Sequence, residues 1–361
     1  MATFARRSTH RWLSSWTSRL KERPQEAFQQ LALFPELAQS SEARQEHQYA
    51  RAVAPLKRML EVCESMAAAQ PALAVEAAWQ LGQVHARLGQ VDDAVKFFRR
   101  DQVYGLDQAI RTLLVHGDAD KAVVLLGSNE KQALEPTSAE LYGQIAQYIK
   151  EGTLSALSSS SLDNADTVEL ANAAALLVAQ SSVKFTAESS SLTALSDDDK
   201  ALFQQAETLW LRATEAAGAT DKENELWAAW SWANLGELYL AQGRDEDALN
   251  ILGKALKVQE KRPEEPLHLA RTLGLIAMGY HRLGQAVTSE GLFATSLETF
   301  QAHQSHLNRV ETLLHGKTLI GYGRLLEQWD KREADGANRV AAGQQVLGTQ
   351  PVPYWLPLFI L

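Results

Sequence analysis

The sequence predicts an all-α solenoid of stacked antiparallel helix pairs. Small and large apolar residues recur with helical spacing in blocks that repeat every 41 or 42 residues, and a period of this size is typical of helical repeat arrays. Gly243 lies between the two helices of the clearest block, and Gly284 holds the same place one block later. With 361 residues, 45% of them hydrophobic, the chain is long enough to bury a large core.

The clearest block runs from residue 230 to residue 257. Its first helix carries Trp232, Leu235, Gly236 and Tyr239 in the order W-x2-L-G-x2-Y, and its second helix carries Ala248, Leu252 and Ala255. We expect Gly236 and Ala248 where the two helices approach most closely, because a larger side chain there would push them apart. Trp232, Tyr239 and Leu252 are expected to fill the core around that contact.

The same pattern recurs before and after this block. Ala206, Trp210 and Ala213 precede their counterparts by 42 residues, Leu273, Ala277, Tyr280 and Gly284 follow theirs by 41, and Phe293 and Ser296 complete the later block. Nearer the N-terminus the matching positions are Leu81, Gly82, Gly89, Ala94 and Phe98, preceded by Ala52, Leu56 and Leu60. A weaker pair is expected around Ala109, Gly117, Ala122 and Leu126, and residues 313–347 read as a degenerate final block without the small-residue spacing.

These motifs resemble those of the tetratricopeptide repeat (TPR) superfamily over residues 43–128 and 198–345. The period near 42, against about 34 in the standard unit, resembles that of the longer, kinesin-light-chain-like subclass, as does the break between helices at Pro263 and Pro266. The resemblance implies a right-handed superhelical solenoid whose first helices line an inner wall. It also implies a protein that works by binding other proteins.

The chain divides into five expected segments. They are a basic amphipathic N-terminal segment (1–40), N-terminal TPR-like repeats (41–135), degenerate helices with Ser-rich loops (136–197), C-terminal TPR repeats (198–347) and an apolar, proline-containing tail (348–361). In the middle segment, residues 180–196 are expected to form a loop between the two helices of one repeat. Ser196, followed by three acidic residues, is expected to cap the second of these helices.

The N-terminal segment has the composition of a targeting sequence. Its first 20 residues contain no Asp or Glu and are rich in Arg, Ser and Thr. Phe4, Trp12 and Trp16 recur near helical spacing, and Arg7 and Arg11 lie on another side of the expected helix. These features are typical of a mitochondrial transit peptide. The segment is therefore expected to direct the chain to the matrix or the matrix face of the inner membrane; the alternative is a docking arm of a cytoplasmic protein.

Charge and composition exclude several classes of function. The whole chain has a net charge of −9, and its first 23 residues hold six basic residues and one acidic residue, so the remainder carries −14. An acidic body of this kind disfavours binding to nucleic acid. No stretch approaches 18 apolar residues, so no transmembrane segment is expected, although a peripheral membrane contact stays open. Cys63, the single cysteine, excludes an intramolecular disulfide and a thiolate-rich zinc site.

The motifs of catalysis and metal binding are missing. The sequence has no phosphate-cradling glycine loop, no G-x-S-x-G elbow and no H-E-x-x-H pair. His303 and His306 can share a helix face, but no carboxylate or cysteine at matching spacing supports them as metal ligands. We therefore expect no catalytic residue, no metal and no cofactor, and a protein that is not an enzyme.

The inner wall of the solenoid is the expected site of partner binding. Residues at offsets of four, three and four on the first helices face this wall, and the candidates are Gln80, Gln83, Arg87, Trp230, Asn234, Glu237, Arg271, Met278 and Arg282. The resemblance implies that Asn234 binds a peptide backbone and that Arg271 supplies a basic group. Leu275 and Met278 stand where a carboxylate clamp needs polar groups, so we expect a mixed or apolar ligand rather than an acidic tail. The alternative is a solvated inner face without a ligand.

The last residues form a second candidate for a contact. PVPYWLPLFIL holds three prolines, which forbid a regular helix, and no charged residue. An exposed tail of this composition is an apolar liability. It is expected either to fold back on the solenoid or to insert into another subunit.

Together these features predict a non-enzymatic TPR scaffold for protein–protein interactions. We expect an accessory subunit or assembly factor of a large mitochondrial complex, such as a respiratory-chain complex, the ATP synthase or the mitoribosome. The alternative is a cytosolic, kinesin-light-chain-like adaptor that binds cargo peptides transiently.

The N-terminal segment gives the first testable prediction. A fluorescent reporter fused to residues 1–40 is expected to enter mitochondria, because the segment combines an acid-free composition with separate basic and apolar faces. Imaging of cells that express the fusion measures this directly. A reporter that stays in the cytosol would contradict the prediction.

Overall fold

The computed structural model describes residues 25–102, 104–128, 134–152, 162, 165–181, 195–217, 222–262, 265–348 and 355–359. The expected targeting sequence, the run Ser158–Ser161 and most of the loop 180–196 therefore lie outside the described residues. The chain forms two compact units, one up to Ala146 and one from Gln147 onward. Each unit is described by itself.

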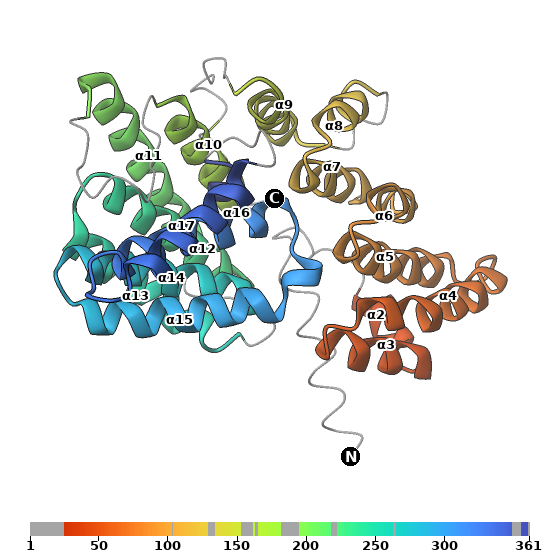
Figure 1. Cartoon of the computed structure of the whole chain (residues 1–361). Helices are drawn as coiled ribbons and strands as arrows, with labels where there is room; N and C mark the ends of the chain where they lie inside the picture. Colours follow the sequence, from red (N-terminus) through yellow and green to blue (C-terminus); the bar gives the residue numbers. More distant parts are fainter. Residues whose placement is uncertain are drawn as a thin grey trace. The chain divides into compact units, whose positions relative to one another are not determined.

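The described residues form sixteen α-helices, two short 3₁₀ helices and no strand, which confirms the all-α prediction (Figure 1). The first unit holds α2 (Gln25–Leu31), α3 (Pro35–Gln45), α4 (Tyr49–Ser65), α5 (Pro71–Arg87), α6 (Val91–Phe98), α7 (Gly105–His116) and α8 (Ala119–Leu126). Helix α9 (Pro136–Glu151) crosses the boundary between the units. The second unit holds α10 (Thr167–Gln180), α11 (Asp197–Ala216), α12 (Lys222–Ala241), α13 (Asp245–Gln259), α14 (Pro266–Arg282), α15 (Ala286–Ala302), η4 (Gln304–His306), α16 (Arg309–Leu326), α17 (Glu333–Gly348) and η5 (Leu356–Leu358).

In the first unit, consecutive helices pack as the pairs α3/α4, α5/α6 and α7/α8. The small residue Gly82 lies against the ring of Phe98, where an added Cβ would come within 2.9 Å of a ring carbon. The short helix α2 packs against α5 and buries Phe28 and Leu31 in one core with Ala52 and Leu56. The core residues Ala52, Leu56 and Ala94 are fully buried, as the repeat pattern predicted.

The second unit consists of the pairs α10/α11, α12/α13, α14/α15 and α16/α17. Helices α10 and α11 pack together although 16 residues separate them in sequence, as expected for two helices of one repeat joined by a long loop. Ser196 caps α11, since its Oγ accepts a hydrogen bond of 3.0 Å from the backbone N–H of Asp199.

The pair α12/α13 shows why the repeat motif needs glycine. A Cβ on Gly236 would lie 2.4 Å from Cγ of Leu252, so the two helices approach closely at this point, as predicted. Ala248 and Ala255 are fully buried on the facing helix. The expectation for Trp232 needs correction, because its side chain is only half-buried, whereas Trp227 one turn earlier is buried.

The final pair, α16/α17, corrects a second expectation, that this block lacks the small-residue spacing. This block has a different spacing of small residues, because two glycines lie seven residues apart on each helix. They are Gly316 and Gly323 on α16, and Gly336 and Gly343 on α17. A Cβ on Gly323 or on Gly343 would lie 2.7 Å from a carbonyl oxygen of the facing helix. The backbones of the two helices therefore touch, which only glycine allows.

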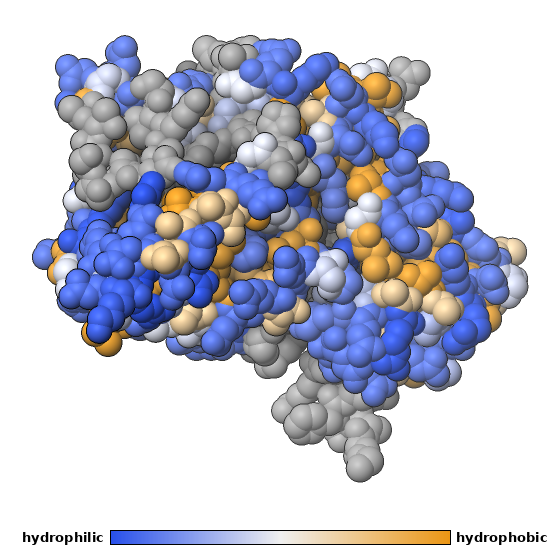
Figure 2. All heavy atoms as spheres, in the orientation of Figure 1, coloured by the Kyte–Doolittle hydropathy of each residue, from blue (hydrophilic) through white to orange (hydrophobic). Residues whose placement is uncertain are grey.

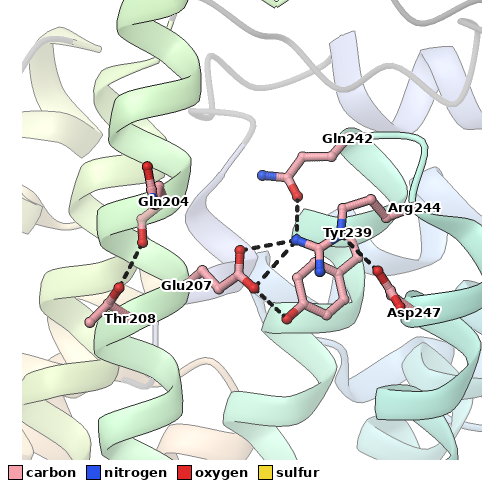
Figure 3. Close-up of polar contacts among 7 residues, drawn as sticks. All are labelled: Gln204, Glu207, Thr208, Tyr239, Gln242, Arg244 and Asp247. Carbon is pink, nitrogen blue, oxygen red and sulfur yellow. Dashed lines mark hydrogen bonds and ion pairs between the residues drawn. The ribbon is translucent and has the colours of Figure 1, made fainter.

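Neighbouring pairs are also joined by polar contacts. Glu207 on α11 accepts hydrogen bonds from Oη of Tyr239 (2.7 Å) and from Nη1 of Arg244 (3.0 Å), as Figure 3 shows. The guanidinium of Arg244 lies over the Tyr239 ring, 3.9 Å from its centre, and also pairs with Asp247. Burial and the neighbouring carboxylate of Glu207 raise the pKa of Tyr239 to about 12. The cluster links α11 to the α12/α13 pair.

Helices α10, α12, α14 and α16 form the inner layer of the second unit, each touching the next. The short helix η5 touches both α10 and α16, the first and last helices of this layer. Packed helix axes lie about 8–10 Å apart, so a flat layer would hold these two helices too far apart for one turn of 3₁₀ helix to reach both. The inner layer therefore curves around η5.

The described part of the face shown in Figure 2 is mainly hydrophilic. On the face shown in Figure 2 the hydrophobic residues gather in small separate groups, and the most exposed large apolar side chains of the described residues include Leu33, Val124 and Val287, which lie far apart in sequence. None of the described helices combines the length and the hydropathy needed to cross a bilayer.

The close approach at Gly236 gives a prediction about stability. Gly236→Ala is expected to lower the free energy of unfolding by about 1–3 kcal/mol, because Leu252 must move away from the new methyl group. Gly253→Ala on α13 is the matched control, since a Cβ there meets no atom within 4 Å and alanine favours a helix by about 1 kcal/mol. Chemical denaturation measures both. Equal stability of the two variants would contradict the packing described here.

Candidate functional site

The inner face of the second unit already holds a peptide segment, which is the chain's own. Nδ2 of Asn234 donates a hydrogen bond of 2.7 Å to the backbone carbonyl of Leu358. All five residues of Trp355–Phe359 are buried. We call the surface around this contact, formed by α10, α12 and α16, the groove, and the segment Trp355–Phe359 the resident segment. Of the two expectations for the tail, folding back on the solenoid is the one observed.

The position of Asn234 follows from helix geometry. Trp230, Asn234 and Glu237 lie four and three residues apart on α12 and therefore share one face. Leu235 and Gly236 belong to another face, where Gly236 packs against α13. The repeat motif that fixes the α12/α13 contact thus directs Asn234 toward the groove.

Beneath the resident segment lies a buried charge cluster of Glu237, Arg271 and Lys317, which come from α12, α14 and α16. Nη2 of Arg271 donates to Oε2 of Glu237 at 2.8 Å, and Nζ of Lys317 donates to Oε1 of the same carboxylate at 2.8 Å. The side chain of Glu237 is 1% exposed and that of Arg271 is 4% exposed. One carboxylate therefore joins three helices of the inner layer.

The ionisation of this cluster is set by two opposing effects. Burial by itself raises the pKa of Glu237, but Lys317 and Arg271 outweigh it and hold the pKa at about 2. Burial also lowers the pKa of Lys317, against the attraction of Glu237, which raises it. The carboxylate is thus ionised at neutral pH and is the common partner of both cations.

Arg271 also fixes the orientation of Asn234. Its Nη2 donates to Oδ1 of Asn234 at 2.7 Å. A guanidinium has only donors, so the oxygen of the amide must face Arg271 and the NH₂ group must face the carbonyl of Leu358. Arg271 is therefore a positioning residue for the backbone contact.

The two aromatic rings of the resident segment contact Lys317 and Tyr148. Nζ of Lys317 lies 5.5 Å from the centre of the Trp355 ring, within range of a cation–π interaction. Tyr148 accepts a hydrogen bond of 3.3 Å from the backbone N–H of Trp355, and its ring lies 5.9 Å from that of Phe359. Burial raises the pKa of Tyr148 to about 12, although the bond from Trp355 lowers it.

Trp230 stands beside the charge cluster. Its ring lies 4.1 Å from that of His268 and 5.9 Å from the guanidinium carbon of Arg271. Nε1 of Trp230 and Nε of Arg271 are buried and have no hydrogen-bond partner among the described residues.

Two other candidates on the second unit lie apart from this cluster. Met278 packs between α14 and α16, in the core around Phe293. Arg282 donates to the carbonyl of Leu240 at 2.6 Å and pairs with Asp245 at 3.0 Å. Both side chains thus contribute to packing between consecutive helices.

In the first unit, Gln80 belongs to a buried network of its own. It accepts a hydrogen bond of 3.1 Å from Arg44 and donates one of 2.8 Å to Glu76. Burial lowers the pKa of Arg44 to about 10. Gln83 and Arg87, further along α5, are only half-buried.

Sequence reasoning missed several members of this site. They include Lys317 and Tyr148, which contact the resident segment, and the acceptor at Leu358 within that segment. Lys317 lies in the block that was read as degenerate, so no inner-face position was assigned there. The spacing of Gly316 and Gly323 on α16 could have marked α16 as a closely packed first helix and Lys317 as a residue next to its contact face.

The arrangement can bind a peptide segment. No group of three or more His, Cys, Asp or Glu residues among the described residues could hold a metal ion. An oriented amide that binds a backbone carbonyl, beside aromatic and apolar side chains, is the chemistry of peptide recognition.

The fold and the groove define a helical-repeat protein that holds a peptide segment against its inner helices. Residues 200–261, which span most of α11 together with α12 and α13, match the family model for the tetratricopeptide repeat. This part of the chain therefore carries tetratricopeptide repeats, and the resemblance predicted from the W-x2-L-G-x2-Y motif is confirmed there.

Comparison with solved structures finds several similar chains. The crystal structure of BtubC (BKLC) from P. vanneervenii aligns with a TM-score of 0.37 and 13% sequence identity, over 83% of this chain and 91% of that chain. A search of curated proteins gave no match.

The charge cluster gives a prediction about pH. Because the pKa of Glu237 is about 2 in the folded chain and 4.5 as an isolated group, its ionised form stabilises the fold above pH 4.5. This contribution, of the order of 3 kcal/mol, is lost as the pH falls from 4.5 through 2. Glu237→Gln is expected to cost about 3–5 kcal/mol at pH 7, since it leaves two buried cations unpaired, and to flatten the pH dependence.

Urea denaturation at several pH values between 2 and 7 tests this prediction. Glu298→Gln is the control, because Glu298 lies exposed on α15. If the Glu237→Gln and Glu298→Gln variants lose stability in parallel with the wild type on acidification, Glu237 does not hold the inner layer together.

Proposed function

We propose that the chain is a non-catalytic scaffold that binds a segment of a partner protein in the groove of its second unit. Tetratricopeptide repeats indicate a protein that mediates protein–protein interactions. The observation that carries the proposal is the hydrogen bond from Asn234 to the carbonyl of Leu358, since it is a contact to a peptide backbone.

The groove is preorganised for such a ligand. Asn234 binds a carbonyl oxygen, which every residue offers, and thus sets the path of the backbone without selecting a side chain. Arg271 holds the amide in the required orientation, so the ordering cost of binding is reduced. Selectivity among peptide sequences then comes from the aromatic and apolar side chains near Asn234.

We further propose that the chain acts in mitochondria, as an accessory subunit or assembly factor of a multiprotein complex. The support is the acid-free, Arg-rich composition of residues 1–20. The alternative setting is a cytosolic adaptor that binds cargo peptides transiently. The kinesin-light-chain-like period supports this alternative.

The role of the groove is tested by a nearly isosteric substitution. Asn234→Asp keeps an acceptor for Arg271 but replaces the donor toward the bound backbone by a second acceptor. It is expected to reduce recovery of the partner about tenfold or more, since an unfavourable polar contact of this kind costs about 1–3 kcal/mol. The measurement is quantitative co-purification with the tagged full chain, from whole cells and from isolated mitochondria.

Asn250→Asp on the exposed side of α13 is the matched control, because it makes the same chemical change outside the groove. Circular dichroism and thermal melting establish that both variants are folded. Full recovery of every partner by a folded Asn234→Asp variant would show that partners bind elsewhere on the chain.

A further inference from the structure

We infer that the groove of the second unit recognises an uncharged, proline-containing apolar segment of a partner protein, and that the resident segment occupies this site in competition with the partner. This inference rests on the proposed function and adds to it the chemistry of the ligand. The resident segment serves as the template.

The backbone contacts of the resident segment can be made by other sequences. Asn234 binds the carbonyl of Leu358 and Tyr148 binds the N–H of Trp355. Neither bond depends on the side chain of the bound residue. Any segment that follows the same path can replace both contacts.

The side-chain contacts define the class of ligand. The resident segment WLPLF has no charged residue, and beneath it the charges of Lys317 and Arg271 are directed to Glu237. Lys317 meets the face of the Trp355 ring, so this position favours an aromatic residue. The ring of Phe359 packs at a tilt against that of Tyr148, which favours a second large apolar residue four positions later.

Proline fits the path of this segment. Pro357 lies within the single 3₁₀ turn η5, near its start, where the missing N–H of proline costs no helical hydrogen bond. Its fixed φ reduces the entropy that the segment loses when it binds. A partner segment with proline between two apolar anchors has the same advantage.

The resident segment is not needed for the contacts within the helix pairs. The close approaches in α12/α13 and α16/α17 are made by Gly236 with Leu252 and by Gly323 with α17. The resident segment lies instead on the inner surfaces of α10, α12 and α16. It can therefore leave while each pair stays intact.

Competition within one chain has a measurable size. A tethered segment acts at an effective concentration of the order of 1 mM. If the free segment binds with a dissociation constant of about 10–100 μM, occupation by the tethered copy weakens the apparent affinity about 10- to 100-fold. A chain whose resident segment is released should therefore bind the free segment about 10- to 100-fold more tightly.

The test uses the full chain and a fluorescent peptide with the sequence of residues 353–361, PYWLPLFIL, carrying a short N-terminal Lys-Lys-Gly tag for solubility. Fluorescence anisotropy compares the wild type with the full-length Trp355→Ala variant, whose resident segment is weakened. The variant is expected to bind the peptide about 10- to 100-fold more tightly. Adding Asn234→Asp should abolish the gain, and a peptide with Trp355→Asp should bind neither protein.

Equal affinity of the wild type and the Trp355→Ala variant would overturn the inference, as would equal binding of the two peptides. Hydrogen exchange provides a second measurement on the unaltered chain, in case the variant does not fold. With saturating peptide, the backbone amides of Trp355, Leu356, Leu358 and Phe359 are expected to exchange at least tenfold faster. Unchanged protection would show that the resident segment is a permanent part of the core.

The outcomes separate this inference from the proposed function. If co-purification depends on Asn234 but the peptide neither binds nor alters exchange, the groove binds a partner of different chemistry and only the inference fails. If the peptide competes with the resident segment but co-purification ignores Asn234→Asp, the ligand class stands and the scaffold recruits its main partner through another surface.

Discussion

The carboxylate of Glu237 is buried between two cations that come from different helix pairs, and the geometry of the groove depends on it. Without this carboxylate, Arg271 and Lys317 would be two like charges in a buried space, and the inner helices α14 and α16 would repel each other there. With it, the guanidinium is held where it orients the amide of Asn234. A structural ion pair thus also determines how a peptide backbone is bound.

The fold could be predicted because its main constraints are local. The contact of Gly236 with Leu252 follows from a motif within one block, and the cap at Ser196 follows from four consecutive residues. The placement of Asn234 and Arg271 on the inner face follows from their offsets on α12 and α14. Trp232 was misjudged because a position in a motif does not say how much of a large ring the neighbouring pair covers.

The site could be predicted only in part, because its remaining members are distant in sequence. Lys317 lies 80 residues from Glu237, and Leu358 lies 124 residues from Asn234. The composition of the last residues indicated that they make an apolar contact. It did not indicate whether they pack against this chain or against another subunit. Periodicity describes each repeat and its neighbours; it carries no information about a segment that crosses several of them.

The contact of η5 with both α10 and α16 changes the mechanical character of the second unit. In an array whose repeats touch only their neighbours, each interface can open separately, and the array is elastic. A segment that contacts the first and the last inner helix adds a long-range restraint across this array. While the segment is bound, the four pairs resist deformation together; after its release, the superhelical pitch can adapt to a different ligand.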